Sequence, residues 1–324
     1  MLGETEVLFK TLDGLKASGK TIIFITHKLS EVTRVADRIT VMRDAKAIVT
    51  RDMEGLDEEK IASLMVGREI STDRIAPPEL IGKVCLAVRN LKYTDKDGVQ
   101  ALKGIDLDVR KGEILGIAGV EGNGQSELAE IIAGLLEPDS GTVKLDDASL
   151  LQMTPRQIRE SGIAHIPEDR MENGVAEVAS VEENLIVDRY YKEKYSRRGK
   201  LNWRYIGERS KELIKQFNVL TKSSKTNVGS LSGGNIQKVV VARELTSNPE
   251  IIIASQPTRG VDIGSEELIH NLLKEARDEG KGVFLISADL DEVLKLSNRL
   301  VVIYDGEITA HFEDASKVKD VDLG

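Results

Sequence analysis

Cysteine, aromatic residues and long hydrophobic runs are all scarce in this chain of 324 residues. Its single cysteine, Cys85, excludes an internal disulfide and fits a reducing compartment, and we expect it to be a small core residue. Aromatic residues make up only 4% of the chain, which disfavours stacking platforms for nucleic-acid bases. No apolar run approaches the roughly 18 residues that a membrane-spanning helix needs.

Positive charge is also in deficit, because 54 acidic residues outnumber 45 basic ones and give a formal net charge of −9. A chain with this balance lacks the electrostatic attraction for phosphate backbones that a general nucleic-acid binder requires. We therefore expect no nucleic-acid partner.

The sequence contains an internal duplication. The segment "GKTIIFITHKLSEVTRVADRITVMRD" (residues 19–44) resembles "GKGVFLISADLDEVLKLSNRLVVIYD" (residues 280–305) at an offset of 261 residues. From residue 3 to residue 44 the alignment has no gap and contains 12 identities in 42 positions. We interpret this as two copies of one domain, of which only the last part of the first is present. The expected boundaries are 1–55 for that remnant, 56–82 for its end and a linker, and 83–324 for the second copy.

The second copy has the pattern of an α/β domain, in which apolar strands alternate with helices and predict a mainly parallel sheet. Its turns contain glycine or polar residues, and its end is typical of a hairpin. The segments that we expect to be regular are a strand, turn and helix over 112–136, a strand over 162–170, a mostly helical region over 182–219, a helix within 230–250, a strand from Ile251, a helix over 265–279 and a strand from Val283.

The segment "GVEGNGQS" has the spacing of a phosphate-binding loop, G-x-x-x-x-G-K-[ST], between a strand and a helix. Glycines there allow backbone N–H groups to converge on a phosphate at the helix N-terminus. Gln125 occupies the lysine position and cannot neutralise phosphate charge, whereas Ser126 remains as a weak Mg²⁺ ligand. A simple tight turn between strand and helix is the alternative. The candidate phosphate-binding residues are Gly119, Gly122, Asn123, Gly124, Gln125 and Ser126.

Three further motifs can be recognised in the sequence. "LSGGNIQK" (residues 231–238) resembles the signature loop of ABC-type ATPases, and "QPTRGVD" (residues 256–262) resembles the segment that leads into their D-loop. "FITHKLSEV" (residues 24–32) is similar to their switch-histidine segment, and the 261-residue offset pairs His27 with Ala288. With "GIAHIPEDR" and "GVEGNGQSEL", these motifs resemble the tandem ATP-binding subunits of carbohydrate-uptake ABC importers, and "ASQPT" is similar to the nucleoside branch.

The resemblance covers nearly the whole chain. It implies an α/β P-loop NTPase fold with a mainly parallel sheet, an antiparallel β subdomain and a helical signature subdomain. It also implies two such domains that dimerise around ATP, each site combining the phosphate loop of one copy with the signature loop of the other. The ATP-contacting positions in this sequence would be Ser232, Gly233, Gly234, Asn235 and Gln237 in the signature loop, then Tyr93, Glu168 and Asp262, with His27 as the catalytic switch residue.

The second copy lacks the charged groups that this family uses for hydrolysis. Gln125 replaces lysine, Ser255 the Mg²⁺-binding aspartate, Gln256 the catalytic glutamate and Ala288 the histidine. Glu168 also replaces the family's glutamine at that position. We therefore expect ATP as ligand, with Mg²⁺ weak or absent at this site, and a second copy that completes another domain's ATP site without hydrolysing ATP itself.

The resemblance implies a peripheral subunit on the cytoplasmic face of the cell membrane. Its partners would be permease subunits, a second ATPase subunit and, indirectly, a solute-binding protein, and its cargo a nucleoside or simple sugar. Tyr190, Tyr191 and Trp203 are candidate permease contacts, as large amphipathic side chains in a charged helical region. A non-enzymatic module that binds permease or nucleotide without turnover is the alternative. A soluble tandem ABC protein that acts on the ribosome is a further alternative, but it would need a long, basic, helical linker between its two copies. Residues 56–82 are short and mixed in charge.

Overall fold

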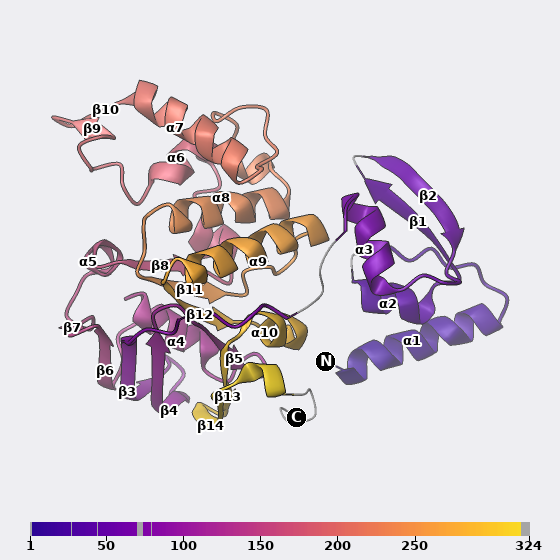
Figure 1. The fold of residues 1–324 in the computed structure, drawn as a ribbon, viewed down its shortest axis with the longest axis horizontal. Coiled ribbons are helices and arrows are strands. Elements are labelled where there is room, and N and C mark those ends of the chain that lie inside the picture. Colours follow the sequence, from indigo (N-terminus) through magenta and orange to yellow (C-terminus); the bar gives the residue numbers. More distant parts are fainter. Residues whose placement is uncertain (1, 27, 44, 70–73, 79, 319–324) are drawn as a thin grey trace. The chain divides into compact units, whose positions relative to one another are not determined.

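The computed structural model describes residues 2–26, 28–43, 45–69, 74–78 and 80–318. The chain forms two compact units, which we call the small unit (Met1–Thr72 with Asp262–Glu267) and the large unit (Asp73–Val261 with Leu268–Gly324). Figure 1 shows the course of the chain through both. Over the described parts of the chain, no helix is both long and apolar enough to cross a bilayer.

The small unit consists of helices and one hairpin. Its elements are α1 (Leu2–Ala17), α2 (Leu29–Val35), β1 (Arg38–Arg43), β2 (Lys46–Asp52) and α3 (Glu58–Val66). Strands β1 and β2 pair antiparallel, and α3 begins where the Asp57 side chain accepts a hydrogen bond from the Lys60 N–H at 2.8 Å. Its core is small: among the described residues, Ile39, Val41 and Ile61 form one buried apolar cluster, and Phe9 and Ala62 are also buried.

The segment 21–26 is not a strand in the structure, contrary to its apolar pattern. The exposed fraction is 88% for Ile23 and 91% for Ile25. A parallel strand needs at least one neighbouring strand for its backbone hydrogen bonds, and the described part of the small unit offers none to this segment.

A six-stranded sheet is the centre of the large unit, with strand order β14-β13-β5-β12-β11-β8. All neighbouring strands are parallel except β14, which pairs antiparallel with β13. This confirms the mainly parallel sheet and the terminal hairpin. The strands are β5 (Ile114–Ala118), β8 (Ile163–Ile166), β11 (Ile251–Ser255), β12 (Gly282–Ile286), β13 (Arg299–Tyr304) and β14 (Glu307–Phe312).

Both faces of the central strands are buried, because side chains alternate between two hydrophobic clusters. On β11, Ile251 and Ile253 belong to the cluster shared with the second sheet, and Ile252 to the cluster shared with the helices α8 and α9. Cys85 belongs to the first cluster and is 1% exposed, as expected of a core residue.

The second sheet of the large unit is antiparallel, with strand order β4-β3-β6-β7. Its strands are β3 (Val84–Thr94), β4 (Gln100–Arg110), β6 (Ser140–Leu145) and β7 (Ala148–Ser149). The helices near the central sheet are α4 (Gln125–Ile132), α5 (Pro155–Glu160), α9 (Ile263–Asp278) and α10 (Leu290–Leu296).

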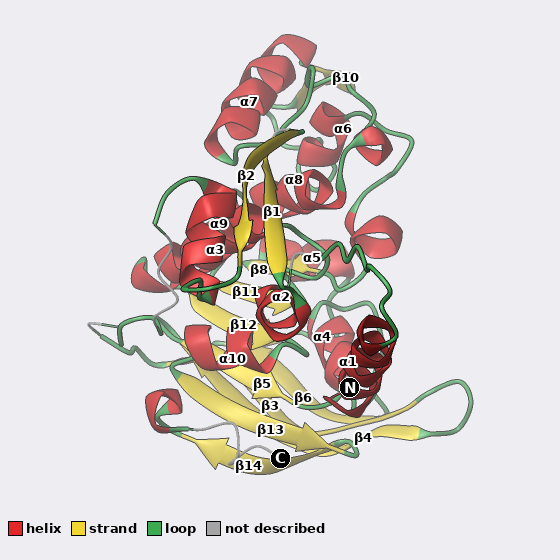
Figure 2. Cartoon of the chain, turned by 90° about the vertical axis from the view of Figure 1, so that its right-hand side faces the viewer, coloured by secondary structure: helices red, strands yellow, loops and turns green. Residues whose placement is uncertain are grey.

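A helical subdomain forms one end of the large unit (Figure 2). It contains α6 (Val181–Ile186), a short ribbon of β9 (Ser196–Arg197) and β10 (Lys200–Leu201), α7 (Trp203–Gln216) and α8 (Gly233–Leu245). The region 182–219, which we expected to be mostly helical, is therefore two helices separated by this ribbon. Ser180 begins α6 with a reciprocal capping box to Glu183, and Asn202 caps α7.

Candidate functional site

The candidate phosphate loop connects the end of β5 to the start of α4. Gly124 precedes α4 with a φ of +103°, which L side chains rarely adopt. A Cβ at this position would also lie 2.5 Å from the carbonyl oxygen of Ala101 on β4. Glycine is therefore required at Gly124 by both conformation and space, as in a loop that brings backbone close to a ligand.

The Gln125 side chain fills this loop from inside. Its Oε1 accepts a hydrogen bond from the Asn123 N–H at 3.1 Å, and its Nε2 donates to the Val120 carbonyl at 3.0 Å. Gln125 is 7% exposed. A lysine could make the second bond but not the first, because an ammonium has no acceptor. One N–H group that would face a phosphate is thus already occupied by a side chain of the loop itself.

Asn123 fixes the loop against the terminal hairpin. Its side chain accepts a hydrogen bond from the Asp305 N–H at 2.6 Å and donates one to the Val120 carbonyl at 2.7 Å. Gly306 N–H donates to the Asn123 carbonyl at 3.2 Å. The loop is therefore held in one conformation by bonds within the protein.

A cavity of about 540 Å³ opens beside Ser126 and contains charges of both signs. The Ser126 hydroxyl donates to Glu168 Oε2 at 2.9 Å, and the other oxygen of Glu168 pairs with the Arg259 guanidinium. Arg259 also lies 3.6 Å from a Glu121 carboxylate oxygen. Ser126, Glu168 and Arg259, which line this cavity, are thus bonded to one another.

The positions at the ends of β11 and β12 carry neutral side chains that interact locally. Ser255 is buried, and its hydroxyl has no hydrogen-bond partner among the described residues. Gln256 has a φ of +48°, and its Oε1 accepts a hydrogen bond from the Ala288 N–H at 3.1 Å. Gln256 and Ala288, two positions that we expected to be degenerate, are therefore bonded to each other.

These residues fit a phosphate poorly and do not fit Mg²⁺. A divalent hard cation needs several oxygen ligands, with carboxylates among them. Glu168 is neutralised by Arg259, and Ser255 supplies only a hydroxyl. Within the described ranges, no group of three acidic, histidine or cysteine side chains could hold a metal. The N-terminus of α4 is still favourable for an anion. However, the Asn123 N–H in this loop is already bonded to the Gln125 side chain.

Two titratable groups that line this cavity, Glu130 and His165, are shifted toward their neutral forms. Burial raises the pKa of Glu130 above its usual value, and the nearby carboxylates of Glu127, Glu168 and Glu172 raise it further. Burial lowers the pKa of His165 to about 4, so this imidazole is neutral at pH 7. Sequence reasoning missed both residues. Their signal was only that Glu130 follows the phosphate loop and that His165 lies at the end of a buried strand.

In the signature segment, Ser232 is exposed while Asn235 and Gln237 are buried. Ser232 is exposed at the N-terminus of the 13-residue helix α8, and its hydroxyl accepts from Asn235 Nδ2 at 2.8 Å. Asn235 Oδ1 accepts from the Leu220 N–H at 2.7 Å, and Gln237 Nε2 donates to the Pro257 carbonyl at 2.8 Å. Asn235 and Gln237 therefore fix the turn while Ser232 stays accessible at a positive helix end.

Glycine at position 233 allows Arg170 to approach this turn. A Cβ on Gly233 would lie 2.6 Å from Arg170 Nη2. The Arg170 guanidinium donates hydrogen bonds to the carbonyl oxygens of Arg259 and Gly260. Arg170 thus links the signature turn to the segment that follows β11.

Tyr93 and Asp262 are further residues that we expected to contact ATP. Tyr93 on β3 pairs with Leu102 on β4, and its partly buried side chain packs on the core. Leu102 in turn lies against Gly124, so Tyr93 belongs to the neighbourhood of the phosphate loop. Asp262 is exposed, and its carboxylate accepts bonds from the N–H and hydroxyl of Ser265 at 3.0 and 2.7 Å. His27 lies outside the described residues.

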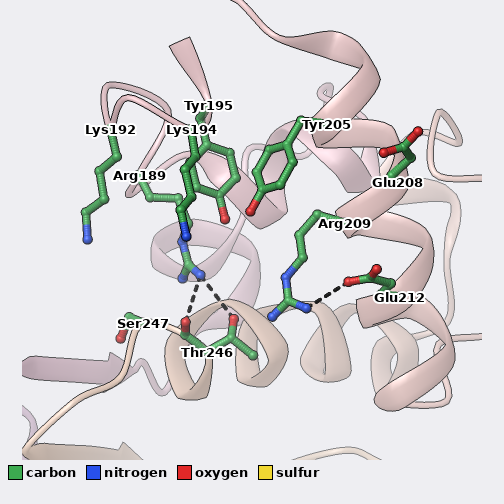
Figure 3. A pocket seen from close by; sticks show the side chains of 10 residues that line it. All are labelled: Arg189, Lys192, Lys194, Tyr195, Tyr205, Glu208, Arg209, Glu212, Thr246 and Ser247. Carbon is green, nitrogen blue, oxygen red and sulfur yellow. Dashed lines mark hydrogen bonds and ion pairs between the residues drawn. The ribbon is translucent and has the colours of Figure 1, made fainter.

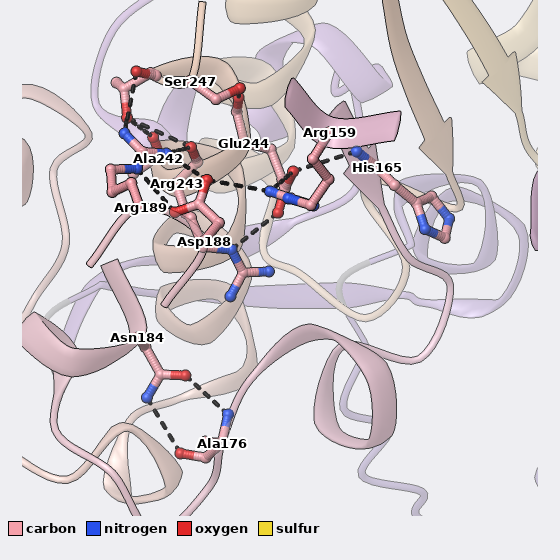
Figure 4. Close-up of polar contacts among 11 residues, drawn as sticks. Arg159, His165, Ala176, Asn184, Asp188, Arg189, Ala242, Arg243, Glu244 and Ser247 are labelled. Carbon is pink, nitrogen blue, oxygen red and sulfur yellow. Dashed lines mark hydrogen bonds and ion pairs between the residues drawn. The ribbon is translucent and has the colours of Figure 1, made fainter. Parts of the chain in front are cut away.

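A buried ionic cluster behind the cavity joins α8 to β8, and sequence reasoning missed it (Figure 4). Glu244 is fully buried, and its carboxylate lies 2.8 Å from both Arg159 and Arg243. It also accepts the His165 N–H at 3.2 Å, and Arg159 reaches Asp188 at 3.2 Å. This cluster connects the helical subdomain to the central sheet.

A glycine-rich loop between a buried parallel strand and a helix defines a nucleotide-binding domain of the P-loop class. Comparison with known proteins identifies the particular family, because the ABC transporter family model matches residues 102–259. The chain therefore contains an ABC-type ATPase domain. The solved dimer of the ATP-binding cassette MJ0796 with ADP and Pi is similar, with a TM-score of 0.63 and 28% identity over 72% of this chain and 100% of that one.

Several relatives carry names that state the solute they import. The chain is 43% identical over 94% of its length to the nucleoside import ATP-binding protein NupA of Lactococcus lactis, and 43% identical over 95% to the guanosine import ATP-binding protein NupO of Bacillus subtilis. It is 37% identical over 98% to the xylose import ATP-binding protein XylG of Thermoanaerobacter pseudethanolicus. The chain spans about 60% of the length of the first two relatives and 63% of the third.

Proposed function

We propose that this chain is the nucleotide-binding part of an ABC importer for nucleosides or simple sugars. Its large unit would supply the signature loop to an ATP site whose phosphate loop belongs to another ATP-binding domain. The observation that carries this proposal is the contrast between the two loops. Gln125 already occupies an N–H group of the phosphate loop, whereas Ser232 is exposed at the N-terminus of α8.

The first test concerns nucleotide binding by the chain itself. We expect weak binding of ATP that does not depend on Mg²⁺, because Gln125 competes for the loop and the Glu168 carboxylate is paired with Arg259. Calorimetric titration with ATP, with and without a chelator, measures both properties. Tight binding that disappears with the chelator would contradict this assignment.

The second test concerns hydrolysis. We expect negligible ATP turnover by this chain, because phosphate neutralisation and water positioning each contribute several orders of magnitude to such reactions. Joining to this chain the residues that precede its match in the Lactococcus lactis relative should supply a competent phosphate loop. Turnover should then depend on Ser232, because an arginine there would block the approach of the signature turn to the terminal phosphate.

Single substitutions in this joined protein test whether turnover depends on the signature turn at Ser232 or on the phosphate loop at Gln125. Ser232→Arg should reduce turnover at least ~10²-fold, while Ser230→Arg, two residues earlier, should leave it close to the parent rate. Gln125→Ala should have little effect, because its loop is not the hydrolytic one. Survival of turnover in Ser232→Arg with loss in Gln125→Ala would reverse the proposed roles.

The partner of the helical subdomain would be a permease, which places the chain at the cytoplasmic face of the membrane. Tyr190 and Trp203 are each 50% exposed, whereas Tyr191 lies under the Arg156 guanidinium at 3.4 Å from the ring centre. We therefore propose Tyr190 and Trp203 as the anchors. Their double alanine variant should lose permease in pull-down, and the exposed Tyr304→Ala should retain it.

A further inference from the structure

A second cavity, of about 440 Å³, lies in the helical subdomain and shares no lining residue with the cavity beside the phosphate loop (Figure 3). We call it the α7 pocket. Four cationic and two carboxylate side chains line it, together with two tyrosines and the Thr246–Ser247 turn. The nucleotide site makes no use of these groups.

The floor of the α7 pocket is rigid. Arg189 is 5% exposed, and its Nε and Nη2 donate to the two oxygens of Asp188 at 2.8 and 2.9 Å. Its Nη1 donates to the carbonyl and hydroxyl oxygens of Thr246, both at 3.1 Å, and Nη2 also donates to the Arg243 carbonyl. All five N–H groups of this guanidinium are therefore satisfied. Arg189 supports the pocket and does not itself donate to a ligand.

The two lysines of the pocket differ from Arg189 in this respect. Within the described part of the chain, neither Lys192 nor Lys194 has a carboxylate oxygen within 4.0 Å of its ammonium. Arg209 pairs with Glu212 at 2.9 Å through one N–H group, and this pair is on the surface. The two lining carboxylates are both already engaged, Glu212 by Arg209 and Glu208 by Arg204 at 3.2 Å. The pocket consequently has an excess of unpaired positive charge.

The two tyrosines add directed hydroxyl groups to this charge. Tyr195 is buried and contacts Tyr205 edge to face, with ring centres 5.2 Å apart. Figure 3 shows both hydroxyl groups on the side of the rings that faces Arg189 and Arg209. Edge-to-face packing fixes the rings, so their hydroxyl groups are held in place before any ligand arrives.

We propose that the α7 pocket binds a phosphate-bearing anion. A phosphate group accepts several charge-assisted hydrogen bonds at once, and Lys192, Lys194 and Arg209 with the Tyr205 hydroxyl provide such donors around one cavity. The rigid floor means that little ordering is needed on binding. Inorganic phosphate and the headgroup of an anionic phospholipid share this chemistry.

Titration of the full chain with inorganic phosphate, followed by amide resonances in ¹H–¹⁵N NMR, tests the proposal. The amides of residues 192–195 and 205–209 should shift together and saturate. Lys192→Glu/Lys194→Glu should weaken this binding at least about tenfold, because each lost charge-assisted bond contributes that much. Lys222→Glu/Lys225→Glu, with the same charge change on exposed lysines outside the pocket, should bind as the parent does. Shifts confined to residues 119–126, or equal weakening by both double variants, would overturn the proposal.

Vesicles distinguish the two sources of the anion. Co-flotation with phosphatidylglycerol vesicles but not with phosphatidylcholine alone, lost in Lys192→Glu/Lys194→Glu, would assign the pocket to a lipid headgroup. Saturable phosphate binding without flotation would assign it to a free phosphate compound. If neither inorganic phosphate nor phosphatidylglycerol vesicles bind in a manner that depends on Lys192 and Lys194, the pocket has no such role.

Discussion

The two segments related by the internal duplication form the same elements at the same spacing, with one exception. Adding the offset of 261 residues to the bounds of α1 (Leu2–Ala17) gives those of α9 (Ile263–Asp278), and α2 (Leu29–Val35) corresponds in the same way to α10 (Leu290–Leu296). The hairpin β1–β2 corresponds to β13–β14, with its first strand matching from end to end. These elements depend mainly on local sequence.

The exception is the strand between the two helices. Residues 282–286 form β12, which pairs with β5 on one side and β11 on the other. The corresponding segment, residues 21–25, is apolar but not a strand, and its side chains are exposed. Helices and hairpins satisfy their backbone locally, whereas a central parallel strand depends on neighbours that are distant in sequence. Apolar composition is therefore sufficient for a strand only where the rest of the sheet is present.

Hydrogen exchange should give the largest contrast between the two segments. The amides of Val283–Ile286 are inside the sheet and should exchange only on global unfolding, while Ile22–Ile25 should exchange almost as an open chain does. We expect protection factors that differ by at least ~10³. Mass-spectrometric exchange on the monomer measures both peptides in one experiment. Equal protection would mean that residues 22–25 are paired in solution, by a second copy or another segment.

Much of the fold was predictable from the sequence, for a physical reason. The strands β5, β11 and β12 are continuous apolar runs, and the glycines of the phosphate loop and the signature turn mark where helices α4 and α8 begin. These signals are local. The order of motifs along the chain then indicated the ABC family, which the comparisons confirmed.

The side-chain pairing within the site could not be predicted in the same way. Arg259 meets Glu168 across 91 residues of sequence, and Arg159 meets Glu244 across 85. Periodicity identifies which face of an element is buried but not which polar side chain it meets there. The substitutions at Gln125 and Gln256 indicated lost charges, yet only the structure shows that each glutamine now bonds to the backbone beside it.

Ion pairs of the two units should differ strongly in their contribution to stability. Glu244 in the large unit is fully buried between Arg159 and Arg243, so Glu244→Ala leaves buried charge unpaired and should cost about 3–5 kcal/mol. Asp37 in the small unit pairs with Lys16 on the surface, and Asp37→Ala should cost at most about 1 kcal/mol. Urea unfolding at pH 7 measures both. A loss below about 1 kcal/mol for Glu244→Ala would contradict a structural role for the cluster.

Alanine substitutions at two corresponding positions of the repeated segment, Leu285 and Phe24, should give a smaller difference in stability. Leu285 is fully buried in β12, and Leu285→Ala should destabilise the large unit by about 2–5 kcal/mol, through lost burial and a new cavity. Phe24 is its counterpart at the 261-residue offset and is partly exposed, so Phe24→Ala should change stability by about 0.5 kcal/mol or less. The midpoint of urea unfolding is the measurement. A large loss in Phe24→Ala would indicate that this side chain has a packing partner in solution.

The smallest expected effect concerns carboxyl groups of the two units, whose pKa values shift in opposite directions. Burial and neighbouring carboxylates raise the pKa of Glu130 above 4.5, so its contribution to stability is greatest below pH 4.5 and declines as pH rises through the raised pKa. Hydrogen bonds from Lys60 lower the pKa of Asp57 below 3.8, so its contribution is present above pH 3.8 and is lost as pH falls through the lowered pKa. Glu130→Gln should therefore be more stable than the parent protein at pH 7 and equally stable near pH 4. Asp57→Asn should be slightly less stable than the parent protein at pH 7 and equally stable in strong acid. Carboxyl ¹³C titration of the parent gives both pKa values directly, and Glu130 titrating below 4.5 would show that its cavity is more hydrated than the packing indicates.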